Sequence, residues 1–467
     1  MSRAGRYSLG VIGITLACYL AAMPLVLKRL NPITGDEPFY VMTGISLIRD
    51  RSLDETANYS RGVYNEFYPD DPLPPEWRGW PGFPRKLPPH AAITARDGLY
   101  TKHGLGLSLL IALPYEAIGR VGAMLVVIAM ASIAALNMHL LGRESGVPHG
   151  LSAAVAISIA LTLPFAPYAL LLFPEVPAAL LMIYAVRRVA APSNSSWQWA
   201  LAGCCIGFLP WLHQRFGPSA VALTTIIAYR ILRSRQLTAA IASGAPIVAG
   251  AASIIAYNLW LYGRPLQNTD DHAGFSSFSG AVNGLFGLLL DAQWGLLIAA
   301  PIYVLAFAGL PTWHRQNNRL MSVAVLTVAP YIGVVAAYQV WWGEWGPPAR
   351  YLVPVIPLAA APIGCVLLKY RSRGRIAAGL LGLSSVGLMI IALGNPQRLY
   401  HHPDGHNNLV GRLSDAVSID LASALVAFQP LSQDALLART IAALLMIVVL
   451  AIVGLLTYWD LLPRRRR

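Results

Sequence analysis

Charged residues are scarce in this sequence. Only 12% of the 467 residues are Asp, Glu, Lys or Arg, and 56% are hydrophobic, whereas an average soluble domain has roughly 25% charged residues. This composition excludes an ordinary soluble enzyme. Apolar stretches of membrane-spanning length recur from Tyr7 to Tyr458 and leave little polar sequence for a second domain. We therefore expect one all-α polytopic membrane domain over residues 1–467.

Cysteine is rare as well, and no cysteine pattern points to a metal or a disulfide framework. All four cysteines lie in apolar segments, which predicts packed thiols. The sequence also has no Gly-rich phosphate loop. A net charge of +13 would suit nucleic-acid binding, but the basic residues cluster at the ends of apolar stretches, which is typical of membrane topology. We expect no nucleic-acid partner.

The apolar stretches predict about 12 transmembrane helices. They are expected at residues 7–27, 121–141, 151–172, 174–189, 197–212, 218–232, 237–261, 285–310, 320–341, 351–368, 376–393 and 436–458. Basic clusters fall on alternate loops, so the positive-inside rule places both termini in the cytoplasm. We expect a multi-pass protein of the cell (inner) membrane, with nearly all carboxylates on the extracytoplasmic side.

Residues 104–119 form a further apolar stretch, but counting it as a span would move the arginine clusters outside. We therefore predict a juxtamembrane or re-entrant helix there, on the outer face. The long extracytoplasmic loops are then residues 31–104, 262–284 and 395–435. Because the cytoplasmic loops are too short for a nucleotide-binding domain, we expect an extracytoplasmic, periplasmic active site that uses a donor held in the lipid.

Two segments of the first long loop carry candidate site residues at the membrane surface. Asp36 and Glu37 follow the first span, where a carboxylate can act as a general base; an acidic helix start before Pro38 is the alternative. At the other end of the loop, Lys102 and His103 follow Tyr100, and both are suited to hold a lipid phosphate. Interfacial snorkelling alone would also explain the lysine.

Three further outer turns carry candidate site residues. Glu175 opens a span behind a proline, and His213 with Arg215 ends another. Glu344, Arg350 and Tyr351 lie in an aromatic turn, where the guanidinium fork of the arginine suits a phosphate. Two clusters mix imidazole and carboxylate, but we interpret them as solvated loops, since neighbouring loop residues do not define a metal geometry. These clusters are residues 270–272 and 401–406. The need for a divalent metal stays open.

With these features the chain resembles the GT-C superfamily of integral-membrane glycosyltransferases. The Asp36-Glu37 pair is similar to the acidic pair of the protein O-mannosyltransferases. Residues 100–104 are similar to the lysine-bearing segment of the aminoarabinose transferases. The 342–351 turn, and residues 257–265, resemble segments of bacterial members of unassigned substrate.

This resemblance implies a polyprenyl-phosphate-linked sugar as donor and transfer with inversion to a lipid, glycan or protein acceptor of the cell envelope. It implies Asp36 as the base and Glu37 as its helper or as a ligand of the acceptor. Three cations would bind the leaving phosphate, and two side chains would contact the sugar or the acceptor. The cations are Lys102, Arg215 and Arg350, and the contacts are Glu175 and His213.

Two other functions compete with this prediction. A transporter or flippase of a lipid-linked or polar substrate is also polytopic, but it should show repeat symmetry and polar groups near the bilayer midplane. The sequence has no such repeat, and the candidate residues lie at the outer edge. A ligase that joins lipid-linked glycans would share the basic outer residues but would not need Asp36.

Overall fold

The described part of the chain is helical. The computed structural model describes residues 3–68, 87–234, 236–267, 274–370, 373–422 and 425–429, with 441 and 444. Within these residues 14 helices have seven or more residues, and the β pairing consists of two isolated bridges, Ala91 with Thr101 and Phe275 with Tyr338. The expected all-α class is confirmed.

The chain folds as two compact units. Unit 1 comprises Met1–Cys18, Ser132–Pro167 and Phe275–Arg467, and unit 2 comprises Tyr19–Ala131 and Tyr168–Gly274. Helices α1 (Arg3–Arg29) and α4 (Leu105–Glu144) pass from one unit into the other. Each unit is therefore built from segments that are far apart in the sequence.

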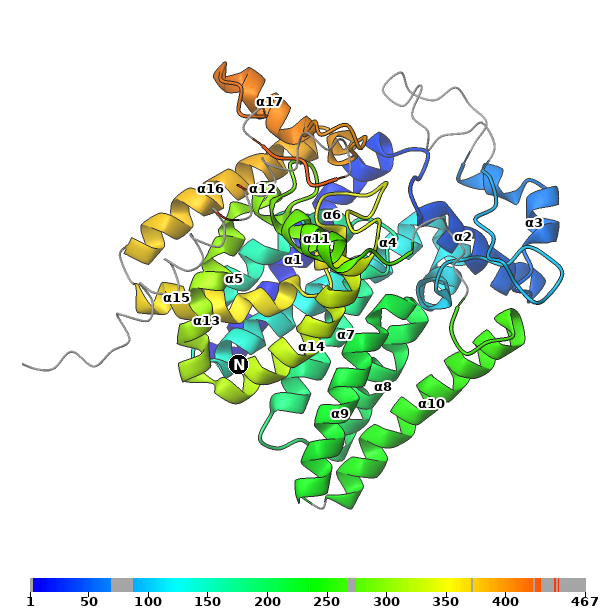
Figure 1. Cartoon of the computed structure of the whole chain (residues 1–467), viewed down its shortest axis with the longest axis horizontal. Coiled ribbons are helices and arrows are strands. Elements are labelled where there is room, and N and C mark those ends of the chain that lie inside the picture. The colour runs from blue at the N-terminus through cyan, green and yellow to red at the C-terminus, as the bar shows by residue number, and fades with distance from the viewer. Residues whose placement is uncertain are drawn as a thin grey trace, which may run out of the picture. The chain divides into compact units, whose positions relative to one another are not determined.

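Unit 2 contains most of the predicted site segments. Its elements are α2 (Glu37–Ile45), η1 (Ser46–Asp50), α3 (Thr56–Ser60), η2 (Val63–Glu66), α7 (Glu175–Ala190), α8 (Ser196–Leu212), η4 (Gln214–Phe216), α9 (Gly217–Ser234) and α10 (Leu237–Tyr262). Helices α8 and α10 lie side by side (Figure 1). A Cβ atom on Gly250 would lie 2.5 Å from the carbonyl oxygen of Gly207, so glycine permits this close helix contact, as is common in membranes.

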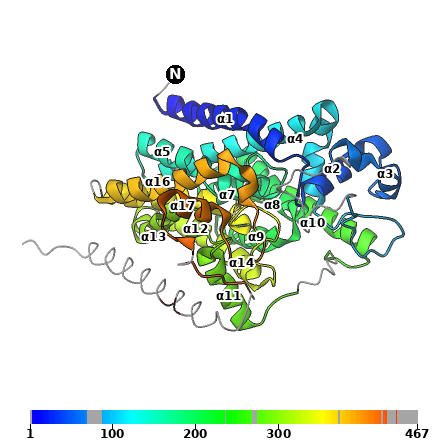
Figure 2. The same cartoon turned by 90° about the horizontal axis from the view of Figure 1, so that it is seen from above.

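Unit 1 contains the remaining helices. They are α5 (His149–Ala160), α6 (Phe165–Tyr168, whose last residue belongs to unit 2), α11 (Phe278–Leu290), α12 (Leu296–Ala299), η5 (Pro301–Tyr303), α13 (Val304–Gln316), α14 (Asn318–Ala337), η6 (Arg350–Leu352), η7 (Ile356–Ala359), α15 (Ala360–Lys369), α16 (Arg373–Gly394), η8 (Pro396–Leu399) and α17 (Asn408–Val417). Helix α11 packs against α14 (Figure 2), and α13 packs against α15.

Several helices are long and apolar enough to cross a membrane. Among the described residues there are four, at Ala4–Arg29, Leu105–Glu144, Leu237–Tyr262 and Asn318–Ala337. Helix α10 exposes large apolar side chains such as Ile241 and Val248, which a lipid environment would cover. The protein is a multi-pass membrane protein, and the number of about 12 spans stays a prediction.

The predicted boundary between a separate outer helix and the second span coincides with a break in α4. Ile118 and Gly119 have non-helical backbone angles inside this element. The structure thus has one helix before residue 118 and another from Arg120 onward. On which side of the membrane the first of these helices lies stays a prediction.

Three predicted spans are not continuous helices. Instead of one helix over residues 151–172, α5 ends at Ala160, since Pro164 cannot donate a helical hydrogen bond. Residues 285–310 are interrupted after Leu290, because the Asp291 carboxylate accepts hydrogen bonds from the amides of residues 293 and 294. Residues 351–368 begin with the short elements η6 and η7. The span expected at 436–458 lies outside the described residues, apart from 441 and 444.

Candidate active site

The first candidate segment forms the start of α2 in unit 2. Asp36 is the N-cap residue and is half-buried, but its side chain makes no capping hydrogen bond. Pro38 occupies the first turn, where its missing N–H group is not needed. The segment is therefore an acidic helix start, which was the alternative to a catalytic role. The Asp36 carboxylate, however, does not cap the helix.

Glu37 is buried inside unit 2. Its carboxylate is 0% exposed and accepts a hydrogen bond of 2.9 Å from the backbone N–H of Leu172. Arg120 Nη2 lies 3.8 Å from the same oxygen. Burial raises the pKa of Glu37 above its usual range, and the charge of Arg120 opposes this. Glu37 therefore ties the start of α2 to two distant segments and fixes the position of Asp36.

The segment around Lys102 is held by pairing with residues 90–92. The amide of Ala92 donates to the carbonyl of Tyr100 at 2.8 Å, and the amide of Lys102 donates to the carbonyl of His90 at 2.9 Å. This antiparallel pairing brings two imidazoles together, with His90 Nδ1 3.4 Å from His103 Nε2. Ligand atoms of His90, His103 and Asp36 all lie within 4.8 Å of one another.

His90 is a site residue that the sequence did not identify. It lies at the end of a proline-rich stretch, and its neighbour His103 is 13 residues away. Both rings stack on Phe39, with ring centroids 3.8 Å and 5.5 Å from it. The sequence therefore gave no periodic signal for His90, since its contact with His103 depends on a β-bridge between two irregular segments.

Further contacts hold Tyr100 and Lys102 in place. Tyr100 is 8% exposed and packs in a small core with Leu261 and Tyr262. The carbonyl of Lys102 accepts a hydrogen bond from Gln267 Nε2, and its side chain is half-buried. These contacts fix the backbone of the segment against the end of α10.

The structure brings the 100–104 segment to the C-terminal end of α8. A Cβ atom on Gly104 would lie 2.3 Å from the carbonyl oxygen of Leu212, so a larger residue would push the two segments apart. Leu212 is followed directly by His213, whose Nδ1 accepts a hydrogen bond of 3.1 Å from the amide of Arg215. Two predicted site segments, distant in sequence, are therefore neighbours in unit 2.

Glu175 and Arg215 form an ion pair. Arg215 Nη2 lies 2.6 Å from Glu175 Oε1, and the Glu175 side chain is 0% exposed while that of Arg215 is 11% exposed. Glu175 opens α7 directly behind Pro174. The pair thus joins the start of α7 to the turn after α8, and the negative charge of Glu175 is matched inside unit 2.

The remaining predicted residues belong to unit 1. Arg350 is buried, donates a hydrogen bond of 3.3 Å to the carbonyl of Gly343 and lies 5.7 Å from the ring centroid of Tyr351. The carbonyl of Tyr351 accepts a hydrogen bond of 2.7 Å from the hydroxyl of Tyr331. Glu344 is exposed, with φ 49°. These residues are grouped with one another, but they lie in a different unit from Asp36.

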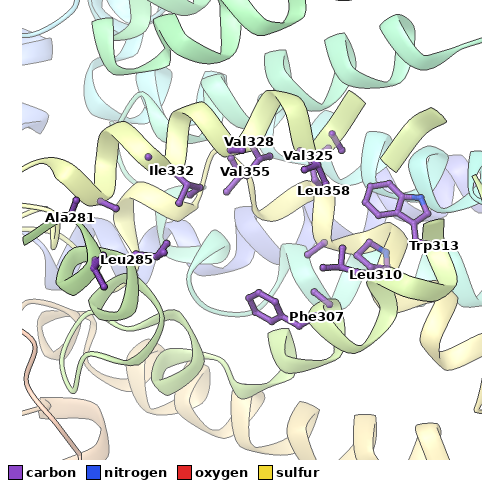
Figure 3. A pocket seen from close by; sticks show the side chains of 18 of the residues that line it. Ala281, Leu285, Phe307, Leu310, Trp313, Val325, Val328, Ile332, Val355 and Leu358 are labelled. Carbon is purple, nitrogen blue, oxygen red and sulfur yellow. The ribbon is translucent and has the colours of Figure 1, made fainter. Parts of the chain in front are cut away.

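Unit 1 also contains an apolar cavity, which Figure 3 shows from close by. Its volume is about 610 Å³, and helices α11, α13 and α14 contribute most of its lining. Phe307 and Leu310 lie opposite Val328 and Ile332 across it. The cavity therefore suits an extended hydrocarbon chain better than a polar ligand.

The comparisons with known proteins agree with this architecture. No protein-family model matches the sequence, and no curated protein matches it significantly. A solved structure does: ArnT from Cupriavidus metallidurans bound to undecaprenyl phosphate matches 84% of this chain with a TM-score of 0.53 and 13% sequence identity. The chain has a fold similar to that of ArnT.

The likeness to ArnT extends over most of this chain but not over all of ArnT. This chain spans 66% of the length of that ArnT chain, slightly less than two thirds. The apo structure of the same ArnT matches 98% of this chain and 76% of the ArnT chain, with a TM-score of 0.48 and 13% identity. At this level of identity the similarity establishes the fold alone.

Proposed function

We propose that this protein is a membrane glycosyltransferase that transfers a sugar from a polyprenyl-phosphate-linked donor to a lipid, glycan or protein acceptor on the extracytoplasmic face. The observation that carries the proposal is the ArnT-like fold together with the placement of Asp36 on α2. One ArnT structure of this fold holds undecaprenyl phosphate, and ArnT is an aminoarabinose transferase. The half-buried Asp36 carboxylate at the start of α2 supports this proposal.

In the proposed reaction Asp36 is the general base. The acceptor hydroxyl gives its proton to the Asp36 carboxylate while its oxygen forms a bond to the anomeric carbon of the sugar. The bond between that carbon and the phosphate oxygen breaks, and the polyprenyl phosphate leaves with the electron pair, so the sugar inverts. Glu37 acts as a positioning residue, since its hydrogen bond to Leu172 fixes the first turn of α2.

The growing negative charge on the leaving phosphate requires nearby cations. Within unit 2 we assign this role to Lys102 and Arg215. The same role for Arg350, which belongs to unit 1, rests on the family resemblance alone. The Glu175 carboxylate orients the Arg215 fork through their 2.6 Å ion pair, and a guanidinium has enough donors to serve a carboxylate and a phosphate together. In this proposal His103 and His213 contact the sugar or the acceptor. Tyr100 and the buried Glu175 position the segments that carry them, and Glu344 and Tyr351 lie in the turn of Arg350.

The apolar cavity of unit 1 supports a lipid-linked donor. A polyprenyl chain is a long hydrocarbon, and the cavity of about 610 Å³ is lined by apolar and aromatic side chains. Burial of such a chain is favourable by roughly 25 cal/mol per Å² of apolar surface in water. Within the bilayer, packing rather than hydration would select the chain.

A transfer assay with purified protein in lipid tests the proposed function. The donors are a panel of radiolabelled polyprenyl-phosphate sugars, and a cell-envelope lipid extract supplies the acceptor. We expect wild type to transfer one of the sugars and Asp36→Asn to lose at least about 100-fold in rate, within the usual range for a general base. Asp97→Asn is the matched control, because Asp97 is exposed in the same loop, and we expect it to keep wild-type activity.

The same preparation tests the competing transporter. If folded wild type leaves every donor intact, and vesicles take up a lipid-linked substrate equally well with Asp36→Asn, the glycosyltransferase proposal is wrong. One feature favours transport: the predicted span at 285–310 is interrupted beside the buried Asp291, and broken helices line many transport sites.

A further inference from the structure

We propose that Asp36, His90 and His103 form a binding site for one divalent transition-metal ion of zinc-like chemistry. Each side chain offers one ligand atom, and the three atoms lie within 4.8 Å of one another. Imidazole nitrogens combined with a carboxylate oxygen are typical ligands of zinc and similar ions, and three protein ligands leave a fourth position open. This assignment uses two histidines and the proposed base.

The separation of the two imidazole nitrogens fits a common ion. His90 Nδ1 and His103 Nε2 are 3.4 Å apart. Two nitrogens that each lie about 2.0–2.1 Å from a tetrahedral zinc ion are about 3.4 Å apart. The same distance is near the upper limit for a hydrogen bond, since N–H···O bonds are usually about 2.9–3.0 Å long. The separation of the two nitrogens thus fits two imidazoles that bind one cation.

The two rings are held in place by their surroundings. His90 lies flat against Phe39, with ring centroids 3.8 Å apart and an angle of 13° between the planes. His103 packs against Tyr40 at 5.1 Å and is only 9% exposed. The backbone pairing of residues 90–92 with residues 100–102 fixes the segments that carry both rings. A site whose ligands are already positioned loses little conformational entropy when the ion binds.

The third ligand connects this site to α2. Asp36 is the N-cap residue of that helix, and Phe39 and Tyr40, which contact the rings, lie one turn further along. One sequence stretch therefore supplies both a ligand and the walls of the site. A carboxylate has two oxygens, so Asp36 can bind the ion through one and accept a proton on the other.

A bound cation would also assist the proposed transfer. An acceptor hydroxyl in the open position would have its pKa lowered by the ion, and its proton would then pass more easily to Asp36. This role rests on the proposed function, whereas the binding of the ion does not. The two ideas are therefore tested by different measurements.

The test is a metal-binding measurement on the full-length protein in detergent, with any affinity tag removed. The protein is first treated with a chelator and then titrated with Zn²⁺, and bound metal is counted after gel filtration. We expect one tightly bound Zn²⁺ in wild type and at least about tenfold weaker binding at this site in His90→Gln and in His103→Gln. His314→Gln, at an exposed position in unit 1, should bind as wild type does.

Two further measurements separate loss of a ligand from loss of the fold. His90→Cys keeps a zinc ligand at the same position and should retain more affinity than His90→Gln. X-ray absorption of zinc-loaded wild type should show two imidazole ligands and an oxygen in the first shell. Equal zinc binding by wild type and by both glutamine variants would overturn the site, as would wild type that binds no zinc.

The outcome for the metal is distinct from the outcome for the enzyme. One zinc ion that depends on His90 and His103, without any sugar transfer, would leave the metal site intact and count against the glycosyltransferase. Sugar transfer that is insensitive to chelation, by a protein that binds no zinc, would support the glycosyltransferase and contradict the metal site. Transport into vesicles that depends on the same histidines would support the metal site but assign it to a transporter instead of a glycosyltransferase.

Discussion

At the scale of single residues, the ion pair of Glu175 and Arg215 shows that one residue of the predicted phosphate site also has a structural role. The two side chains are 2.6 Å apart, and Glu175 is fully buried. Arg215 therefore stabilises unit 2 even when no substrate is bound. Removing it would leave a buried carboxylate without its matching charge, which is costly.

We expect Arg215→Gln to lower the free energy of unfolding by about 3–5 kcal/mol, because Glu175 would lose its counter-charge. The double variant Glu175→Gln, Arg215→Gln should recover most of this loss, since it removes both charges together. Thermal unfolding in detergent, with the single variants beside the double one, measures the coupling. Purely additive losses would show that the pair is unimportant for stability and leave Arg215 to the substrate alone.

Sequence reasoning found Asp36 and Glu37 as a pair but could not assign them different roles. Successive residues of a helix point in directions about 100° apart, so one carboxylate is half-buried and the other is fully buried. His90 lay beyond prediction, since its partner is brought in by the bridge between Ala91 and Thr101. Residue types and spacing indicated where the site residues lie along the chain, whereas burial and pairing required the fold.

At the scale of elements, α2 is attached to the loop that follows it through a buried carboxyl group. Thr43 Oγ1 lies 2.6 Å from Glu55 Oε1 and 2.9 Å from the carbonyl oxygen of Phe39. The Thr43 hydroxyl is the donor in both contacts. Its hydrogen bond to Glu55 lowers the pKa of that carboxyl, an effect that burial outweighs. Burial accordingly raises the pKa of Glu55 from 4.5 to about 7.

This linkage predicts a pH-dependent stability of unit 2. Because the folded pKa lies above the unfolded one, the stabilisation is complete below about pH 4.5 and is lost as the pH rises through about 7, a difference on the order of 3 kcal/mol. We expect the melting temperature of wild type to fall between pH 5 and pH 8 relative to that of Glu55→Gln. Glu66→Gln, at an exposed position of the same loop, should follow wild type, and parallel profiles for wild type and Glu55→Gln would contradict the prediction.

Element boundaries were predictable where the chain is regular. The predicted spans at 174–189, 197–212, 218–232 and 237–261 agree within two residues with α7, α8, α9 and α10. The segments at 151–172 and 285–310 are not continuous helices, and hydropathy did not show this because it averages over interruptions. One proline or one carboxylate hardly changes the mean hydropathy of an apolar stretch, but it removes or replaces helical hydrogen bonds.

At the scale of the whole molecule, composition was sufficient for the class of protein. Scarce charge and frequent apolar stretches predicted a multi-pass helical membrane protein, and the structure and its likeness to ArnT confirm this. The division into two units was not predictable, since each unit combines segments from distant parts of the chain. Hydropathy reports local apolar length and contains no information on which segments pack together.

The orientation in the membrane is the prediction that every functional argument needs, because the proposed site must face the side that has lipid-linked sugars. Single cysteines test it. In a background where the exposed Cys18 and Cys204 are replaced by alanine, a membrane-impermeant maleimide added to intact spheroplasts should label Asp97→Cys, which lies in the first long loop. Ser193→Cys, exposed between α7 and α8 next to the Arg187 and Arg188 cluster, should react only after permeabilisation, since the positive-inside rule places it in the cytoplasm. Labelling of both positions from the same side would contradict the topology, and with it the extracytoplasmic placement of Asp36.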